Sequence, residues 1–326
     1  MIFLNILILI VGFVGLIKGA DFFVDGSASL AKKFNISSLI IGLTIVAFGT
    51  SAPELAVSTT AALKHSNEIA LSNVIGSNLF NTLCVLGMCA LFHPVPSSSD
   101  LMKRDMPFSM IVTALVWLLG GGMAVFSIIR KGAEFGTQTV GTIGRLDAAV
   151  ILVLFAGYMF FVVKSAINNP EEEGEEISDF SMKKCILLMI GGVIMIVVGG
   201  QAVVNAAKAI ALSLGMSEAL VGLTIIAVGT SLPELVTSMV AARKHETGLA
   251  VGNVIGSNLF NLMFILGTTA MISPVAVTAE LAIHLVFLIG ISLISYVFLL
   301  SKMELNRIEG MAMILIYAAQ MAFAIR

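Results

Sequence analysis

Apolar stretches of about 20 residues follow one another along the whole chain and are separated by short polar breaks. A helix of that length crosses the ~30 Å hydrocarbon core of a bilayer. The pattern predicts ten membrane-spanning helices, at residues 2–28, 37–63, 68–92, 105–127, 143–165, 182–210, 217–242, 248–273, 279–300 and 308–325.

Five spans precede the longest polar stretch and five follow it. We therefore divide the 326-residue chain into a first repeat at 1–165, a linker at 166–181 and a second repeat at 182–326. Because each repeat has an odd number of spans, the second must enter the membrane from the opposite side. The predicted fold class is an all-α polytopic membrane protein with two inverted five-helix repeats, an arrangement that many secondary transporters use.

An internal duplication supports this division. Residues 41–81 and 221–261 align without a gap, and 26 of the 41 positions are identical. Equivalent residues in the two copies differ in number by 180. Each copy places a carboxylate, several hydroxyls, amides and a proline inside otherwise apolar sequence, so polar chemistry is expected twice within the membrane.

The first part of each copy predicts a broken helix near the membrane midplane. GTSAPEL (49–55) and GTSLPEL (229–235) each contain a proline, which lacks an N–H and clashes with the carbonyl four residues earlier. We expect the breaks to free backbone carbonyls near Ala47 and Ala227. Irregular backbone at membrane depth is tolerated only where it is buried in protein or lines a cavity.

Glu54 and Glu234 follow these breaks. An ionised carboxylate within the membrane is unfavourable by several kcal/mol unless it is paired or binds a cation. Neither motif contains a Lys or Arg. A mobile cation is therefore the expected partner.

The second part of each copy adds neutral oxygens. SNVIGSNLFN (72–81) spaces Asn73, Ser77 and Asn81 four residues apart on one helix face, and GNVIGSNLFN (252–261) repeats the stripe. Together the copies supply carboxylates, hydroxyls, amides and carbonyls, a set that suits hard cations such as Ca²⁺ and Na⁺. For Asn73, Asn78, Asn253 and Asn258, hydrogen bonding between helices stays an equal alternative.

Composition agrees with a membrane protein, since 58% of residues are hydrophobic and 12% charged, against about 25% charged in soluble proteins. The net charge of −2 excludes a basic nucleic-acid-binding face. The three cysteines lie in apolar segments and are interpreted as packing residues. No nucleophile and base pair up as an enzyme would need.

Charge in the loops predicts orientation. Eleven Lys and Arg residues fall on one side and six on the other, which places both termini outside and the 166–181 linker in the cytoplasm. The run of glutamates in that linker is interpreted as a solvated tether rather than a Ca²⁺ sensor, because its spacing matches no Ca²⁺-binding loop. Asp21 and Asp25 are expected at an interfacial helix end, partly neutralised by Lys18. The N-terminal stretch has no basic residue before its apolar run, so we interpret it as the first transmembrane helix and not a cleaved signal.

The doubled motifs GTSAPEL…GSNLFN and GTSLPEL…GSNLFN, with ten spans in inverted halves, resemble the calcium/cation antiporter superfamily, and most closely its prokaryotic sodium/calcium exchanger branch. The resemblance implies that Glu54 and Glu234 are ligands shared by Na⁺ and Ca²⁺, and that the first and sixth spans slide across the other eight. It also implies side-chain ligands at Thr50, Ser51, Ser77, Asn81, Thr230, Ser231 and Ser257, with carbonyl ligands at Ala47 and Ala227.

Asn261 departs from the superfamily pattern, in which Asp is common at this position. We keep it among the candidate ligands. The site then holds two formal negative charges in place of three, which is expected to weaken Ca²⁺ binding and leaves the ion stoichiometry open.

The predicted function is Na⁺/Ca²⁺ antiport across the plasma membrane of a prokaryotic cell. The expected partners are the lipid bilayer and the two transported ions, with no cofactor and no protein partner, so the chain is expected to act as a monomer. Two alternatives stay open: a Ca²⁺/H⁺ antiporter in which the same glutamates titrate, and a passive cation channel. Inverted repeats favour a moving transporter over a static pore.

Overall fold

The computed structural model describes residues 2–64, 67–125, 130, 138–168, 180–216, 221, 225 and 227–324. Most of the linker, residues 169–179, lies outside this part. The first half contains α1 (Ile2–Phe34), α2 (Ser38–Ile41), η1 (Gly42–Val46), α3 (Ala47–Thr50), α4 (Ala52–Leu63), α5 (Asn67–Phe80), η2 (Asn81–Val85), α6 (Leu86–Phe92), β1 (Val95–Pro96), η3 (Leu101–Asp105), α7 (Met106–Leu119), β2 (Thr139–Ile143) and α9 (Arg145–Asn168). The second half contains α10 (Met182–Ser213), α12 (Ala227–Gly229), α13 (Leu232–Arg243), α14 (Thr247–Leu259), η5 (Phe260–Ile265), α15 (Leu266–Ile272), β3 (Val275–Thr278), α16 (Ala279–Lys302), β4 (Glu304–Leu305) and α17 (Arg307–Ala324).

Every one of the ten expected spans contains helix. Among the described residues, six unbroken helices are long and apolar enough to cross a membrane, and the path from α2 to α4 adds a seventh, bent by 49°. The labels η1, η2, η3 and η5 mark π-helical turns, which the hydrophobic pattern did not predict. The predicted all-helical membrane fold is confirmed, with two small two-stranded sheets added.

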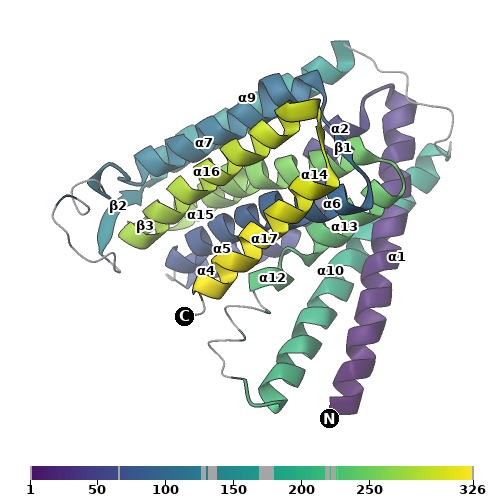
Figure 1. Ribbon diagram of the computed structural model, residues 1–326, viewed down its shortest axis with the longest axis horizontal. Coiled ribbons are helices and arrows are strands. Elements are labelled where there is room, and N and C mark those ends of the chain that lie inside the picture. Colours follow the sequence, from purple (N-terminus) through teal and green to yellow (C-terminus); the bar gives the residue numbers. More distant parts are fainter. Residues whose placement is uncertain are drawn as a thin grey trace.

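The two sheets reveal how the halves are related. β1 pairs antiparallel with β4, and β2 pairs antiparallel with β3, so each sheet joins one half to the other. β1 and β3 occupy equivalent places in the two repeats, since Val95 and Val275 differ by 180. The sheets nevertheless lie at opposite ends of the bundle (Figure 1). Equivalent elements at opposite ends are what an inverted duplication produces, and the predicted inverted repeats are confirmed.

Burial separates central helices from lipid-facing ones. Of the most apolar window in α14–α15, 94% is buried within the protein, and in α5–α6 the share is 78%. The corresponding window of α1 is only 17% buried. The motif-bearing helices therefore form the centre, where neighbouring protein can satisfy polar side chains that lipid could not.

α1 and α10 stand side by side and run steeply across the other helices (Figure 1). Glycines let their backbones touch: a Cβ on Gly19 would lie 2.8 Å from the carbonyl oxygen of Gly192, and one on Gly192 would lie 2.7 Å from that of Gly19. Gly12 and Gly199 repeat this reciprocal contact. Close approach of this kind is how small residues join helices in a membrane.

Candidate cation-binding site

The two turns that the duplication repeats, GTSAPEL and GTSLPEL, break their helices where the prolines predict. Ser51, between α3 and α4, has φ −82° and ψ 10°, and Ser231, before α13, has φ −92° and ψ 8°. Each new helix then begins with proline in its first turn, where the missing N–H has no helical partner to lose. Glu54 and Glu234 also fall in these first turns, where the positive end of the helix dipole stabilises a carboxylate.

The two halves exchange hydrogen bonds at these turns. Ser51 Oγ donates to Glu234 Oε1 at 2.8 Å, and Ser231 Oγ donates to Glu54 Oε1 at 2.9 Å. Each serine thus binds the carboxylate of the opposite half and not that of its own motif. One site is therefore built from both repeats.

Both carboxylates are enclosed, with side chains at 1% exposure for Glu54 and 0% for Glu234. The second oxygen of each, Oε2, is buried without a hydrogen-bond partner among the described residues. Such atoms are unfavourable unless a ligand satisfies them. Two buried, partly unsatisfied carboxylates in one place are the feature most indicative of a cation.

Thr50 links the first turn to α14. Its Oγ1 donates to Asn253 Oδ1 at 3.0 Å and lies 3.5 Å from Ser257 Oγ. Ser77, the equivalent of Ser257, places its Oγ 3.5 Å from Glu54 Oε1. The predicted residues Thr50, Ser77 and Ser257 therefore gather around the two carboxylates.

The terminal asparagines of the motifs differ in their contacts. Asn81 is fully buried, and neither its Oδ1 nor its Nδ2 has a partner among the described residues. Asn261 donates from Nδ2 to Asn78 Oδ1 at 3.0 Å, while its Oδ1 is unpartnered. Thr230 Oγ1 is likewise unpartnered. These oxygens are free to ligate an ion.

Asn73 and Asn253 act as braces. Asn73 Nδ2 donates to Ser58 Oγ at 3.0 Å and to the backbone oxygen of Glu54 at 3.3 Å. Asn253 makes the same pair of contacts, to Ser238 Oγ at 2.9 Å and to the backbone oxygen of Glu234 at 3.5 Å. For these two residues the helix-joining alternative is confirmed, because their amides fix the turn that carries each glutamate.

The backbone carbonyls are less free than the sequence suggested. Ala47 O accepts from Ser51 N at 3.1 Å and lies 3.4 Å from Thr50 Oγ1, so the break does not release it. In the second half Ser231 N donates to Val228 O at 3.2 Å, one residue later. Ligation by Ala47 and Ala227 stays a prediction that would use a remaining lone pair.

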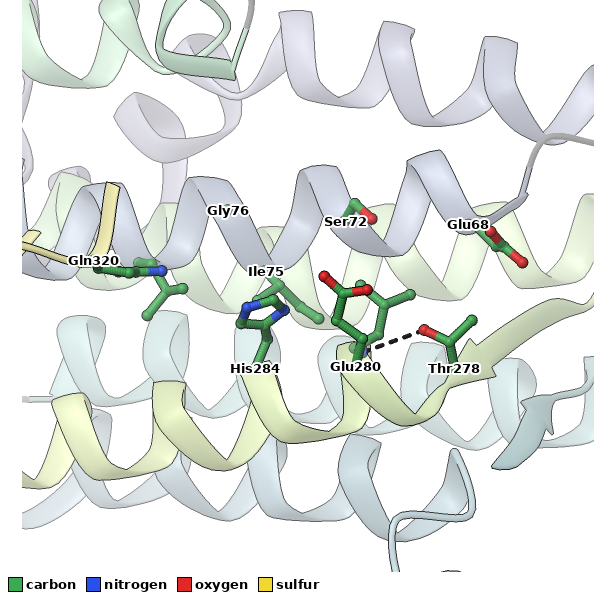
Figure 2. A pocket seen from close by; sticks show the side chains of 10 residues that line it. Glu68, Ser72, Ile75, Gly76, Thr278, Glu280, His284 and Gln320 are labelled. Atoms are coloured by element: carbon green, nitrogen blue, oxygen red, sulfur yellow. Dashed lines mark hydrogen bonds between the residues drawn. The ribbon is translucent and has the colours of Figure 1, made fainter. Parts of the chain in front are cut away.

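Two pockets flank the site without containing it. One of about 250 Å³ lies between α4 and α10 and reaches both broken turns through Pro53, Thr230 and Pro233. The other, of about 280 Å³, opens between α5 and α16, where Glu68 and Ser72 face Glu280 and His284 (Figure 2). No candidate ligand lines the second pocket.

The donor set consists of oxygen alone. Among the described residues no group of three or more His, Cys, Asp and Glu side chains could hold a metal ion. A cation here would be held by two carboxylates and by neutral oxygens, which fits Na⁺ or Ca²⁺ better than zinc or copper.

Sequence reasoning did not identify Ser58 or Ser238, which hold the ligand-bearing helices in register. A signal for both was present, because the two serines recur at equivalent positions of the duplication. The exchange of partners between halves carried no such signal, since spacing within one helix says nothing about its neighbour.

Comparison with known proteins agrees with this architecture. The family described as "Sodium/calcium exchanger protein" matches residues 4–164 and 184–326. The chain belongs to the sodium/calcium exchanger family. Its resemblance to the prokaryotic branch is thereby confirmed.

Relatives of this family cover nearly the full chain. The sodium/calcium exchanger MaX1 of Methanosarcina acetivorans is 32% identical over 352 residues, covering 98% of each protein. The putative antiporter CaxA of Alkalimonas amylolytica is 36% identical over 316 residues, covering 94% of each. The solved structure of the sodium-calcium exchanger NCX_Mj, soaked with Na⁺ and Sr²⁺, superposes with a TM-score of 0.83 at 31% identity and covers 99% of both chains.

Proposed function

We propose that this chain is an antiporter that moves Ca²⁺ out of the cell in exchange for Na⁺ entering it. The observation that carries the proposal is the pair of buried carboxylates, each bonded to a serine of the opposite half and each with one unpartnered oxygen. Two negative charges can be neutralised by one Ca²⁺ or by sodium ions. The two ions therefore compete for one site.

Exchange follows when only the ion-loaded site can change sides. An empty pair of buried like charges is unfavourable, because each carboxylate has left water and repels the other. Loading with Ca²⁺ or with Na⁺ removes that repulsion. Inverted repeats supply the movement, because one half can adopt the conformation of the other around a fixed central site.

The ligands we assign to the ions are Glu54 and Glu234 at the centre, with Thr50, Ser51, Ser77, Asn81, Thr230, Ser231, Ser257 and Asn261 as neutral side-chain ligands and Ala47 and Ala227 as carbonyl ligands. Ser51 and Ser231 already contact the carboxylates. The unpartnered oxygens of Asn81, Asn261 and Thr230 support their inclusion.

The proposal places the chain in the plasma membrane with both termini outside and the 166–181 linker in the cytoplasm, between repeats at 1–165 and 182–326. It needs no cofactor, no catalytic residue and no protein partner, and one chain suffices because both glutamates belong to it. The Lys and Arg distribution supports the orientation.

The test is Ca²⁺ uptake into proteoliposomes that contain Na⁺, compared with vesicles that carry only a proton gradient. We expect uptake when internal Na⁺ runs outward and none with the proton gradient alone. Uptake driven by protons and indifferent to Na⁺ would establish the Ca²⁺/H⁺ alternative, and uptake that needs no counter-ion gradient would establish a channel.

A further inference from the structure

Lys244, at the end of α13, forms ion pairs that tie α1 to α13. Its Nζ lies 2.7 Å from Asp25 Oδ1 and 3.4 Å from Asp21 Oδ1, and it donates to the backbone oxygen of Asp21 at 3.2 Å. The three side chains are 29% to 42% exposed. The sequence predicted that Lys18 would neutralise both aspartates. In the structure Lys18 pairs with Asp21 alone among the two, at 3.5 Å.

The inverted copy of this contact contains amides in place of the two carboxylates. The equivalents of Asp21 and Asp25 are Gln201 and Asn205 on α10, while Lys64 is the equivalent of Lys244. Gln201 Nε2 donates to Asn205 Oδ1 at 2.9 Å, so the two amides satisfy each other. Among the described residues Lys64 makes no ion pair.

The two copies also differ in packing. α1 packs along α13. Between α10 and α4, the equivalent pair, lies instead the pocket of about 250 Å³ that includes Val57 and Gln201. Val57 is 37% exposed, whereas its equivalent Thr237 is 0% exposed. The contact between α1 and α13 is thus closed and contains two carboxylates, whereas α10 and α4 are separated by a pocket and present amides in their place.

When a transporter with inverted repeats opens to the other side of the membrane, each half adopts the conformation that the other half had before. We propose that Lys244, Asp21 and Asp25 form an ionic latch that holds α1 against α13 and biases the chain toward the conformation seen here. The opposite conformation would close α10 onto α4, where Lys64 meets amides instead of carboxylates. This inference rests on the alternating access of the proposed function. It adds that the chain prefers one of the two conformations.

The test compares the exposure of Val57 and Thr237. A cysteine at either position, in a background with Cys84, Cys89 and Cys185 replaced by alanine, is reacted with N-ethylmaleimide in nanodiscs without an ion gradient. In the latched protein the cysteine at 57 should react fast and the cysteine at 237 slowly. Asp25→Asn or Lys244→Gln should change the ratio of the two rates by about fivefold toward 237, the effect of an ion pair worth about 1 kcal/mol.

Matched controls come from the same chain. Lys18→Gln removes a positive charge from α1 that does not reach α13. Lys64→Gln removes the equivalent of Lys244, for which the repeat provides amides rather than carboxylates. Both substitutions should leave the ratio of the two rates unchanged. The pair Gln201→Asp and Asn205→Asp gives Lys64 its partners and should shift the ratio in the same direction as unlatching. The exchanged pair Asp25→Lys with Lys244→Asp should restore the original ratio.

An unchanged ratio in folded Asp25→Asn and Lys244→Gln proteins would overturn the latch. Equal shifts in Lys18→Gln or Lys64→Gln would overturn it as well, because any loss of positive charge would then suffice. The measurement involves no transport, so it distinguishes failure of the latch from failure of Na⁺/Ca²⁺ exchange. A chain that exchanges the ions but ignores these substitutions would refute the latch alone.

Discussion

The two halves repeat their main carboxylate and asparagine contacts at the centre of the molecule and differ at its edge. The serine–glutamate hydrogen bonds that join the halves measure 2.8 and 2.9 Å, and the Asn73 and Asn253 braces repeat contact for contact. At the edge, Lys244 pairs with two aspartates, whereas the equivalents of these three residues are Lys64, Gln201 and Asn205, and Lys64 makes no ion pair among the described residues. A symmetric centre lets ions reach the same site from either side of the membrane. An asymmetric edge lets the protein favour the conformation that opens to one side.

The largest effect should come from removing either central charge. Glu54→Gln and Glu234→Gln keep the shape of the side chain, and we expect each to lower Na⁺-driven Ca²⁺ uptake by about 100-fold or more, since a buried charged ligand is worth several kcal/mol. The two losses should be equal. Glu68→Gln, an exposed carboxylate on α5, is the control and should transport normally. Transport activity retained by either Glu54→Gln or Glu234→Gln would contradict the proposal that both carboxylates form one ion site.

Adding a third negative charge to the site should have the opposite effect to removing one and should strengthen Ca²⁺ binding. Asn261→Asp introduces a third carboxylate, and we expect Ca²⁺ affinity to rise by about tenfold, because a unit charge near 4 Å contributes a few kcal/mol that desolvation partly cancels. The measurement is calorimetric titration with Ca²⁺. Asn81→Asp tests the equivalent position, and unchanged affinity in both would place these asparagines outside the ligand shell.

Removing the hydrogen bonds between the halves should have a symmetric effect, smaller than the loss of a central carboxylate. Ser51→Ala and Ser231→Ala each delete one hydrogen bond to a charged group, worth about 1.5–3 kcal/mol, so Ca²⁺ affinity should fall by roughly 10- to 150-fold in either variant. Thr44→Val is the control, since its hydroxyl binds only its own helix, at Ile40 O. Very unequal losses from the two serines would show that the centre is not functionally symmetric.

The smallest effect concerns stability. Gly192→Ala would place a methyl group 2.7 Å from Gly19 O and should destabilise the α1–α10 pair by about 1–3 kcal/mol. Gly191→Ala, next to it, meets no described atom within 4 Å and should be neutral or slightly stabilising. Thermal unfolding of the two purified variants measures the difference. Equal melting temperatures would mean that this close packing is not needed.

Much of the fold follows from sequence because membrane helices must be long, apolar and internally hydrogen-bonded. The ten spans, their inversion and the breaks at Pro53 and Pro233 rest on those constraints. The duplication then pointed to Glu54 and Glu234, since a buried charge without a partner within its motif demands one elsewhere.

The rest depends on contacts between helices that spacing does not encode. Ser51 belongs to the same motif as Glu54 and yet donates to Glu234 of the opposite half. Asp21 and Asp25 were expected to be neutralised by Lys18 on their own helix, yet Asp25 pairs with Lys244, more than 200 residues away in sequence. The π-helical turns beginning at Asn81 and Phe260 were also missed, since one inserted residue leaves the hydrophobic pattern almost unchanged.

Competition between the two ions tests the central claim most directly. Calorimetric titration of the purified chain with Ca²⁺, repeated at increasing Na⁺ concentration, should give an apparent Kd for Ca²⁺ that rises steadily with Na⁺, while Glu54→Gln and Glu234→Gln bind neither ion. Ca²⁺ binding that is indifferent to Na⁺, with wild-type affinity kept in either variant, would contradict a site shared by the two ions and built from both halves.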